Sequence, residues 1–184
     1  MFKRMKTLPQ TQSGYSLVEV LVAISVLLIA LVGPLTIAYQ GLKSANLAKN
    51  VNTAFFLAQE GIELVQLGRE NAGLERYSNT GSTHWTGDDS IPGGLCAVGD
   101  PCGIDSDTVT LEACSTLGCE LYWHDTGVGR FRHESSGGED TNFVREITLT
   151  PAGDYLLVES MVTWGNTSDE QVTLQTYLFN IYDL

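Results

Sequence analysis

The chain has four cysteines that could bind a metal or form disulfides, and their spacing helps to decide between the two; they are Cys96, Cys102, Cys114 and Cys119. The segments CAVGDPC and CSTLGC lack the C-x2-C spacing of common zinc sites, so we expect disulfides and no metal. Four cysteines allow three pairings. We favour the local pairs Cys96–Cys102 and Cys114–Cys119, each of which closes a short loop.

Histidines and aspartates are the other candidate metal ligands. His124 and His133 could form a site with Asp125, while His84 stands apart from them in the sequence. Exposed loop histidines without a metal are far commoner, and we favour that interpretation.

A loop cluster of aspartates could take calcium, which prefers hard oxygen ligands. The cluster lacks a complete calcium-loop signature, so we favour a solvated acidic loop; its members are Asp100, Asp105 and Asp107. No residue stands in a nucleophile motif and no glycine-rich phosphate loop is present. We therefore expect no catalytic residue, no cofactor and no enzyme.

Glu19 lies at the start of a long apolar stretch, in which Val20–Leu42 has no charged residue. A carboxylate in the bilayer core costs about 2.5–3.5 kcal/mol, so its presence there needs a reason. The stretch is long enough to span a membrane at a rise of about 1.5 Å per residue. Its length, and the absence of a small-x-small site after it, argue against an ordinary secretory signal. Lys3, Arg4 and Lys6 precede it, which places the N-terminus in the cytoplasm and the remainder outside.

Residues 15–70 are predicted to form one helix, because a row of apolar residues continues at spacings of three and four beyond the apolar stretch. Pro34, preceded by Gly33, should kink the helix or melt one of its turns. We expect the apolar row to be core; its members are Ala48, Val51, Phe55, Ala58, Ile62 and Val65.

The last part of the chain is predicted to form strands. Alternating apolar residues favour strands at 142–150, 155–164 and 171–180, with weaker candidates at 108–112, 119–123 and 129–133. An antiparallel sheet with one buried face needs a cover, which the amphipathic half of the helix can supply. The expected fold is α+β, with a long N-terminal helix packed on a C-terminal antiparallel sheet. We divide the chain into a leader (1–14), a membrane half-helix (15–42), an amphipathic half-helix (43–70) and an extracytoplasmic globular domain (71–184).

Charge is distributed unevenly along the chain. The sequence has 22 acidic and ten basic residues, and three of the basic ones precede Gly14. The part after Gly14 therefore has 22 acidic and seven basic residues, a net charge of −15. A surface of this kind repels phosphate backbones, so we expect no direct nucleic-acid binding.

The stretch SGYSLVEVLVA resembles the processing site of type IV prepilins and of type II secretion pseudopilins. In that family a basic leader ends in glycine, a prepilin peptidase cuts after it, and the new N-terminal residue is N-methylated. The resemblance assigns cleavage to Gly14 and Tyr15, and N-methylation to Tyr15. The family's glutamate, fifth after the cut, matches Glu19. Tyr15 replaces the usual phenylalanine, and Pro34 lies earlier than the family's helix proline.

The resemblance implies a reason for the buried charge. In a filament, the α-amine of Tyr15 in one subunit would meet Glu19 of a neighbour, although Glu19 could instead reach the lipid headgroups. The stretch EVLVAISVL is closer to minor subunits than to major pilins. We therefore predict a minor pilin of a type IV pilus-like filament. Its expected partners are the prepilin peptidase, other pilins, the inner-membrane assembly platform and membrane lipid.

Two other functions stay open. The chain could be a minor pseudopilin of a type II secretion system, which is a related building block. It could also be an extracellular binding module that is tethered by an uncleaved signal anchor.

Overall fold

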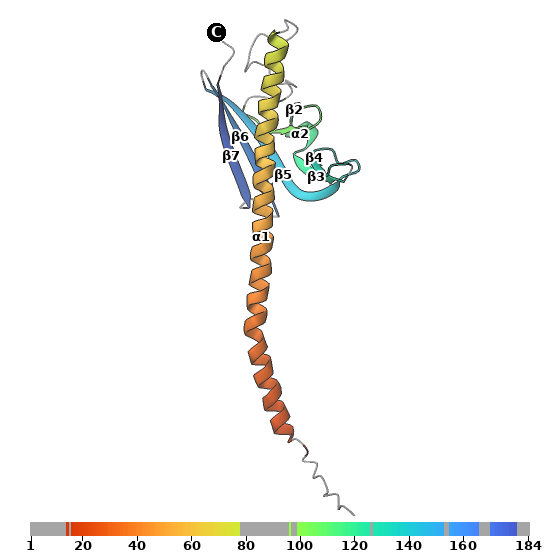
Figure 1. Cartoon of the computed structure of the whole chain (residues 1–184), viewed down its shortest axis with the longest axis vertical. Coiled ribbons are helices and arrows are strands. Elements are labelled where there is room, and N and C mark those ends of the chain that lie inside the picture. Colours follow the sequence, from red (N-terminus) through yellow and green to blue (C-terminus); the bar gives the residue numbers. More distant parts are fainter. Residues whose placement is uncertain are drawn as a thin grey trace, which may run out of the picture. The chain divides into compact units, whose positions relative to one another are not determined.

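The computed structural model describes residues 14, 16–77, 96, 99–125, 127–152, 155–165 and 170–179. The chain divides into two units, Met1–Asn46 and Leu47–Leu184. His84 and Tyr15 lie outside the described residues. The layout is α+β, as predicted, with one long N-terminal helix and a C-terminal antiparallel sheet (Figure 1).

The long helix α1 spans Leu17–Tyr77 and ends later than the predicted limit at residue 70. The segment after residue 70 contains alanine, leucine, glutamate and arginine, which favour helix, and these outweigh Gly73. Of the two expected effects of Gly33 and Pro34, the melted turn is wrong, because α1 continues through both residues, whereas the kink stays a prediction. Proline removes only one helical hydrogen bond and the flanking turns persist.

The sheet is built around one long strand, β5 (Glu139–Ala152). One side of β5 pairs with β6 (Tyr155–Trp164), which pairs with β7 (Gln171–Phe179). The other side is shared by β1 (Cys102–Ile104) and β3 (Glu120–His124). Beyond them lie β2 (Leu111–Ala113) and β4 (Arg130–Arg132). A short helix, α2 (Cys114–Leu117), interrupts the region that was predicted to be all strands.

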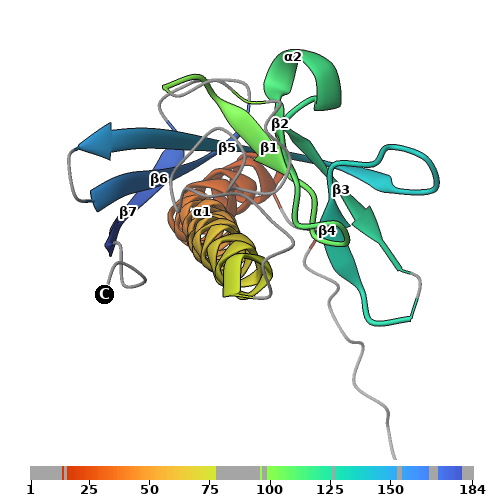
Figure 2. The ribbon, with the colours of Figure 1, turned by 90° about the horizontal axis from the view of Figure 1, so that it is seen from above.

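The C-terminal half of α1 covers the concave side of this sheet, as Figure 2 shows. Ala54, Leu57 and Ala58 pack with Val162 and Trp164 in one buried cluster. Val65 joins a second cluster with residues of β1, β2, β5, β6 and β7. The predicted cover of the sheet by the helix is thus present.

The face that α1 turns toward the sheet differs from the predicted apolar row. Ala58 and Val65 are buried, but Val51 and Phe55 are 39% and 45% exposed. The buried row instead contains small residues, among them Ala54 and Gly61. The prediction weighted large apolar side chains, whereas close contact between a helix and a sheet selects small ones.

Gly61 is the point of closest approach between α1 and the sheet. A Cβ atom at this position would lie 2.8 Å from both Ile147 Cδ1 and Ser160 Oγ, and 3.1 Å from Arg145 Cδ. All three neighbouring side chains are fully buried and have little room to move. The absence of a side chain at Gly61 therefore sets the distance between helix and sheet.

Gly61→Ala should lower the unfolding free energy of the full chain in detergent micelles by about 1 kcal/mol. Overpacking costs about 1–3 kcal/mol and exceeds the helix-propensity gain of up to about 1 kcal/mol. The matched control is Gly41→Ala in the same helix, where a Cβ meets nothing within 4 Å. Denaturant unfolding that finds Gly61→Ala as stable as Gly41→Ala would show that the sheet can move away from the helix.

Candidate functional site

The N-terminal segment is described from Gly14 onward, without Tyr15. Gly14 is exposed and a Cβ there would meet nothing within 4 Å. Ser16 starts the helical hydrogen bonding, since its carbonyl accepts from the Val20 amide at 3.2 Å. The glycine that precedes the predicted cut therefore lies directly before α1 and is open to approach.

Glu19 lies in the first turn of α1, where a carboxylate interacts favourably with the partial positive charge of the helix N-terminus. Within the described part of its own unit, its side chain is exposed and has no hydrogen-bond or ion-pair partner. The surrounding side chains are apolar and also exposed, including Leu17, Val18 and Val22. Glu19 is thus an available acceptor on an apolar helix.

The apolar part of α1 has the properties of a membrane-spanning helix. By length and composition α1 is the one helix, among the described residues, that could cross a membrane. The hydroxyl groups of Ser25 and Thr36 bond to the backbone of the helix itself. Ser25 Oγ donates to the Leu21 carbonyl at 2.8 Å, and Thr36 Oγ1 donates to the Val32 carbonyl at 2.9 Å. These bonds satisfy polar groups that lipid could not.

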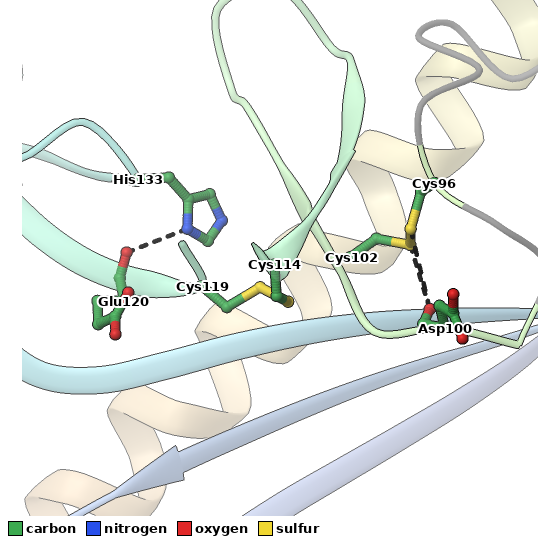
Figure 3. Close-up of a disulfide and its surroundings, with 7 residues drawn as sticks. All are labelled: Cys96, Asp100, Cys102, Cys114, Cys119, Glu120 and His133. Atoms are coloured by element: carbon green, nitrogen blue, oxygen red, sulfur yellow. Dashed lines mark hydrogen bonds between the residues drawn. A yellow bond between two sulfur atoms is a disulfide. The ribbon is translucent and has the colours of Figure 1, made fainter. Parts of the chain in front are cut away.

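The cysteines form the two local disulfides that we favoured, Cys96–Cys102 and Cys114–Cys119 (Figure 3). Cys102 lies on β1 opposite Ile147 of β5, so the first disulfide fastens the preceding loop to the sheet. The second closes α2 onto the start of β3. Both bonds reinforce the side of the sheet that has the shortest strands.

His124 and His133 are buried, contrary to the expectation of exposed loop histidines. The Nε2 atom of His124 lies 2.7 Å from the Glu134 carbonyl, so it donates a hydrogen bond there. His133 Nδ1 lies 3.1 Å from the Glu120 carbonyl and donates to it, as Figure 3 shows. Asp125 is exposed. The described residues contain no cluster of three metal-ligating side chains.

The aspartate loop is held by internal contacts. Asp105 Oδ1 accepts hydrogen bonds from the Asp107 amide at 2.9 Å and the Thr108 amide at 2.8 Å. Burial alone would raise the pKa of Asp105, but these hydrogen bonds and the charge of Arg132 outweigh it and lower the pKa. Asp107 pairs with Arg130 at 2.6 Å and with Arg132 at 2.8 Å. Carboxylates engaged in this way order the loop between β1 and β2.

Arg145 is a polar core residue whose partners the sequence did not reveal. Its side chain is fully buried, and Nη1 donates to Glu60 Oε2 at 2.9 Å and to the Leu57 carbonyl at 3.3 Å. Nη2 donates to the Ile104 carbonyl at 3.2 Å. Burial lowers the pKa of Arg145, and the opposing charge of Glu60 limits that effect. One guanidinium thus joins β5, α1 and β1.

His133 is kept neutral by its surroundings. Burial and the nearby charge of Arg145 lower its pKa from 6.5 to about 4, against smaller opposing effects of Glu120 and Asp105. With the proton on Nδ1, the buried Nε2 atom has no hydrogen-bond partner among the described residues. Protonation of His133 would place a second cation beside Arg145.

His133 should make the domain sensitive to acid. The unfolded chain takes up this proton near pH 6.5 and the folded chain only near pH 4, so stability is full above pH 6.5 and falls as the pH drops toward 4. The loss from this residue at pH 4 is about 3 kcal/mol. Denaturant unfolding at pH 7 and pH 4 should show a smaller loss for His133→Asn, which keeps a donor for the Glu120 carbonyl. Equal losses in both proteins would mean that His133 does not contribute.

Comparison with known proteins supports the prediction of a prepilin-like motif at the N-terminus. The family model "Prokaryotic N-terminal methylation motif" matches residues 9–33, which include Gly14, Tyr15 and Glu19. No curated protein and no solved structure matched the chain. The match covers the end of the leader and the first part of α1. The chain thus carries the hallmark of type IV prepilin-like proteins together with a long N-terminal apolar helix.

Proposed function

We propose that the chain is a minor subunit of a type IV pilus-like filament, cut by a prepilin peptidase after Gly14. The observation that carries the proposal is the methylation motif at residues 9–33, joined to a helix apolar enough to span a membrane. In this proposal Tyr15 becomes the N-terminal residue and is N-methylated. The chain is a building block, and the enzymatic steps belong to its partners.

The position of Glu19 supports assembly through the helix. Cleavage after Gly14 would create an α-amine at Tyr15, and in a filament this amine would pair with Glu19 of a neighbour. Two unit charges about 4 Å apart gain roughly 4 kcal/mol at an effective dielectric constant of 20, before the cost of desolvation. A docked Glu19 is therefore tolerated in apolar surroundings where an unpaired one is not. The pair would fix the register between neighbours.

The C-terminal domain fits an extracytoplasmic location. Disulfides persist outside the cytoplasm, and both pairs lie in the Leu47–Leu184 unit. The basic leader before Gly14 favours a cytoplasmic N-terminus before processing. The chain would stay in the membrane through α1 until the assembly platform moved it into a filament.

A minor pseudopilin of a type II secretion system is the related alternative. The motif and the helix serve both systems, and the same peptidase chemistry would process both. Genes adjacent to this one would separate them, because secretion genes favour a pseudopilin and adhesion or pilus genes favour a minor pilin.

Glu19→Ala should be cut, inserted and folded normally but should enter filaments poorly. Removal of the carboxylate eases insertion, because a charge in the bilayer core costs about 2.5–3.5 kcal/mol. It also leaves the neighbour's α-amine unpaired in apolar surroundings. The measurement is the amount of the subunit in sheared filaments relative to the amount in membranes.

Ser25→Ala is the matched control for this experiment. It removes another polar group from the same helix, but one that bonds only to the Leu21 carbonyl. We expect it to enter filaments as the native chain does. Unchanged incorporation of Glu19→Ala would reject the docking role of the carboxylate.

A further inference from the structure

Three strands form the outer edges of the described sheet, and they differ in how well they resist pairing with another strand. β2 and β4 have three residues each, and they carry Glu112, Arg130 and Arg132. Short, charged edge strands are a common protection against edge-to-edge association. β7 is the third edge, and among the described residues only β6 pairs with it.

β7 has none of the usual protections. Its nine residues, QVTLQTYLF, include no charged residue, no proline and no glycine, and its pairing with β6 runs without a bulge. Tyr177 and Phe179 are 54% and 57% exposed on its outer face. Strands with these properties are sites of association with other chains.

The side of α1 nearest to β7 adds apolar surface at the same edge. Arg69 Nη1 donates to the Phe179 carbonyl at 3.4 Å, which fixes the side of α1 that faces β7. Val51 lies on that same side, because about 18 residues make five helical turns. The exposed ring of Phe55 follows one turn later. A strand added beside β7 would cover part of this surface.

We propose that β7 pairs antiparallel with β7 of a second copy of this chain. The register centred on Gln175 pairs all nine residues of both strands. It places Val172 opposite Leu178 of the partner, and Leu174 opposite Thr176 of the partner. Thr173 then lies opposite the partner's Tyr177, and aromatic side chains next to β-branched ones stabilise cross-strand contacts. No pair in this register brings two charges together.

Electrostatics favours a second copy at this surface over other surfaces of the same chain. Two copies, each with a net charge of −15 after Gly14, repel one another wherever acidic residues meet. β7 itself has no charged residue, and the carboxylate of Glu159 on the adjacent β6 accepts a hydrogen bond from Gln175, so the strand adds no charge of its own to the contact. Salt should therefore strengthen the contact, because it screens the repulsion between the remaining surfaces. A partner of opposite charge would show the reverse dependence.

The direction of the strands restricts where the contact can form. β7 runs lengthwise along the C-terminal half of α1 (Figure 1). Antiparallel pairing therefore points these helix segments of the two copies in opposite directions. Neighbours in one filament have parallel helices, so the contact would join copies on two filaments or two cells. This last step rests on the proposed function, whereas the strand pairing does not.

Single cysteines in the full chain test the pairing. In the symmetric register Gln175 meets Gln175 of the partner, while Gln171 of the two copies lie about 27 Å apart. After mild oxidation in detergent micelles, Gln175→Cys should give about ten times more disulfide-linked dimer than Gln171→Cys. A mixture of Gln171→Cys and Phe179→Cys chains should link to each other, and the yield should rise with salt. Circular dichroism checks that each variant is folded.

The outcomes separate this inference from the proposed function. Equal yields at positions 171 and 175, or no dimer from any variant, would overturn the pairing even if the chain enters filaments. Dimers in the predicted pattern from a chain that never enters filaments would support the pairing and reject the filament role.

Discussion

The close contact between α1 and strands β5 and β6 is the constraint on which the Leu47–Leu184 unit depends. Gly61 permits the contact, because any side chain there would meet Ile147 and Ser160. Arg145 then fills the space beneath the helix and donates to Glu60 of α1 and to the β1 carbonyl of Ile104. Removing Glu60 would leave the buried guanidinium of Arg145 without its counter-charge, which costs up to about 3–5 kcal/mol. Helix, central strands and the disulfide-bonded hairpin are therefore coupled through one side chain.

Much of this arrangement could be predicted from the sequence, because the spacing of apolar residues along the chain indicates which segments form helix and which form strands. Strand 155–164 has the predicted limits, and α1 covers the sheet as expected. The alternation at 142–150 puts Arg145 on the same face as Phe143 and Ile147, and an arginine among apolar residues is a signal of a polar contact. Its partner Glu60 is distant in sequence, so no local pattern could identify it. Val51 and Phe55 were predicted to be buried but are exposed, because the helix face that becomes buried depends on contacts with the sheet, which lie far away in sequence.

The candidate site in the N-terminal segment could be predicted for a different reason, because its proposed role depends on the order of residues along the chain and on partner proteins, not on the packing of the sheet. Gly14 and Glu19 are assigned from sequence alone, since a glycine, a carboxylate and a long apolar stretch occur together behind a basic N-terminal segment. The family model that matches residues 9–33 supports that interpretation. The histidines were misjudged, because burial of His124 and His133 arises from tertiary packing around β3 and β4. The methylation motif thus lies at the N-terminal end of the molecule, and the strand contact that we propose lies in the sheet domain.

The N-terminus of the native chain, purified from membranes, tests the central claim most directly. Edman sequencing together with the mass of the N-terminal peptide identifies both the cut and the modification. Our account predicts that the chain begins at Tyr15, with one methyl group on its α-amine. A chain that begins at Met1 would contradict the account, and would identify a membrane-tethered module with an uncleaved anchor.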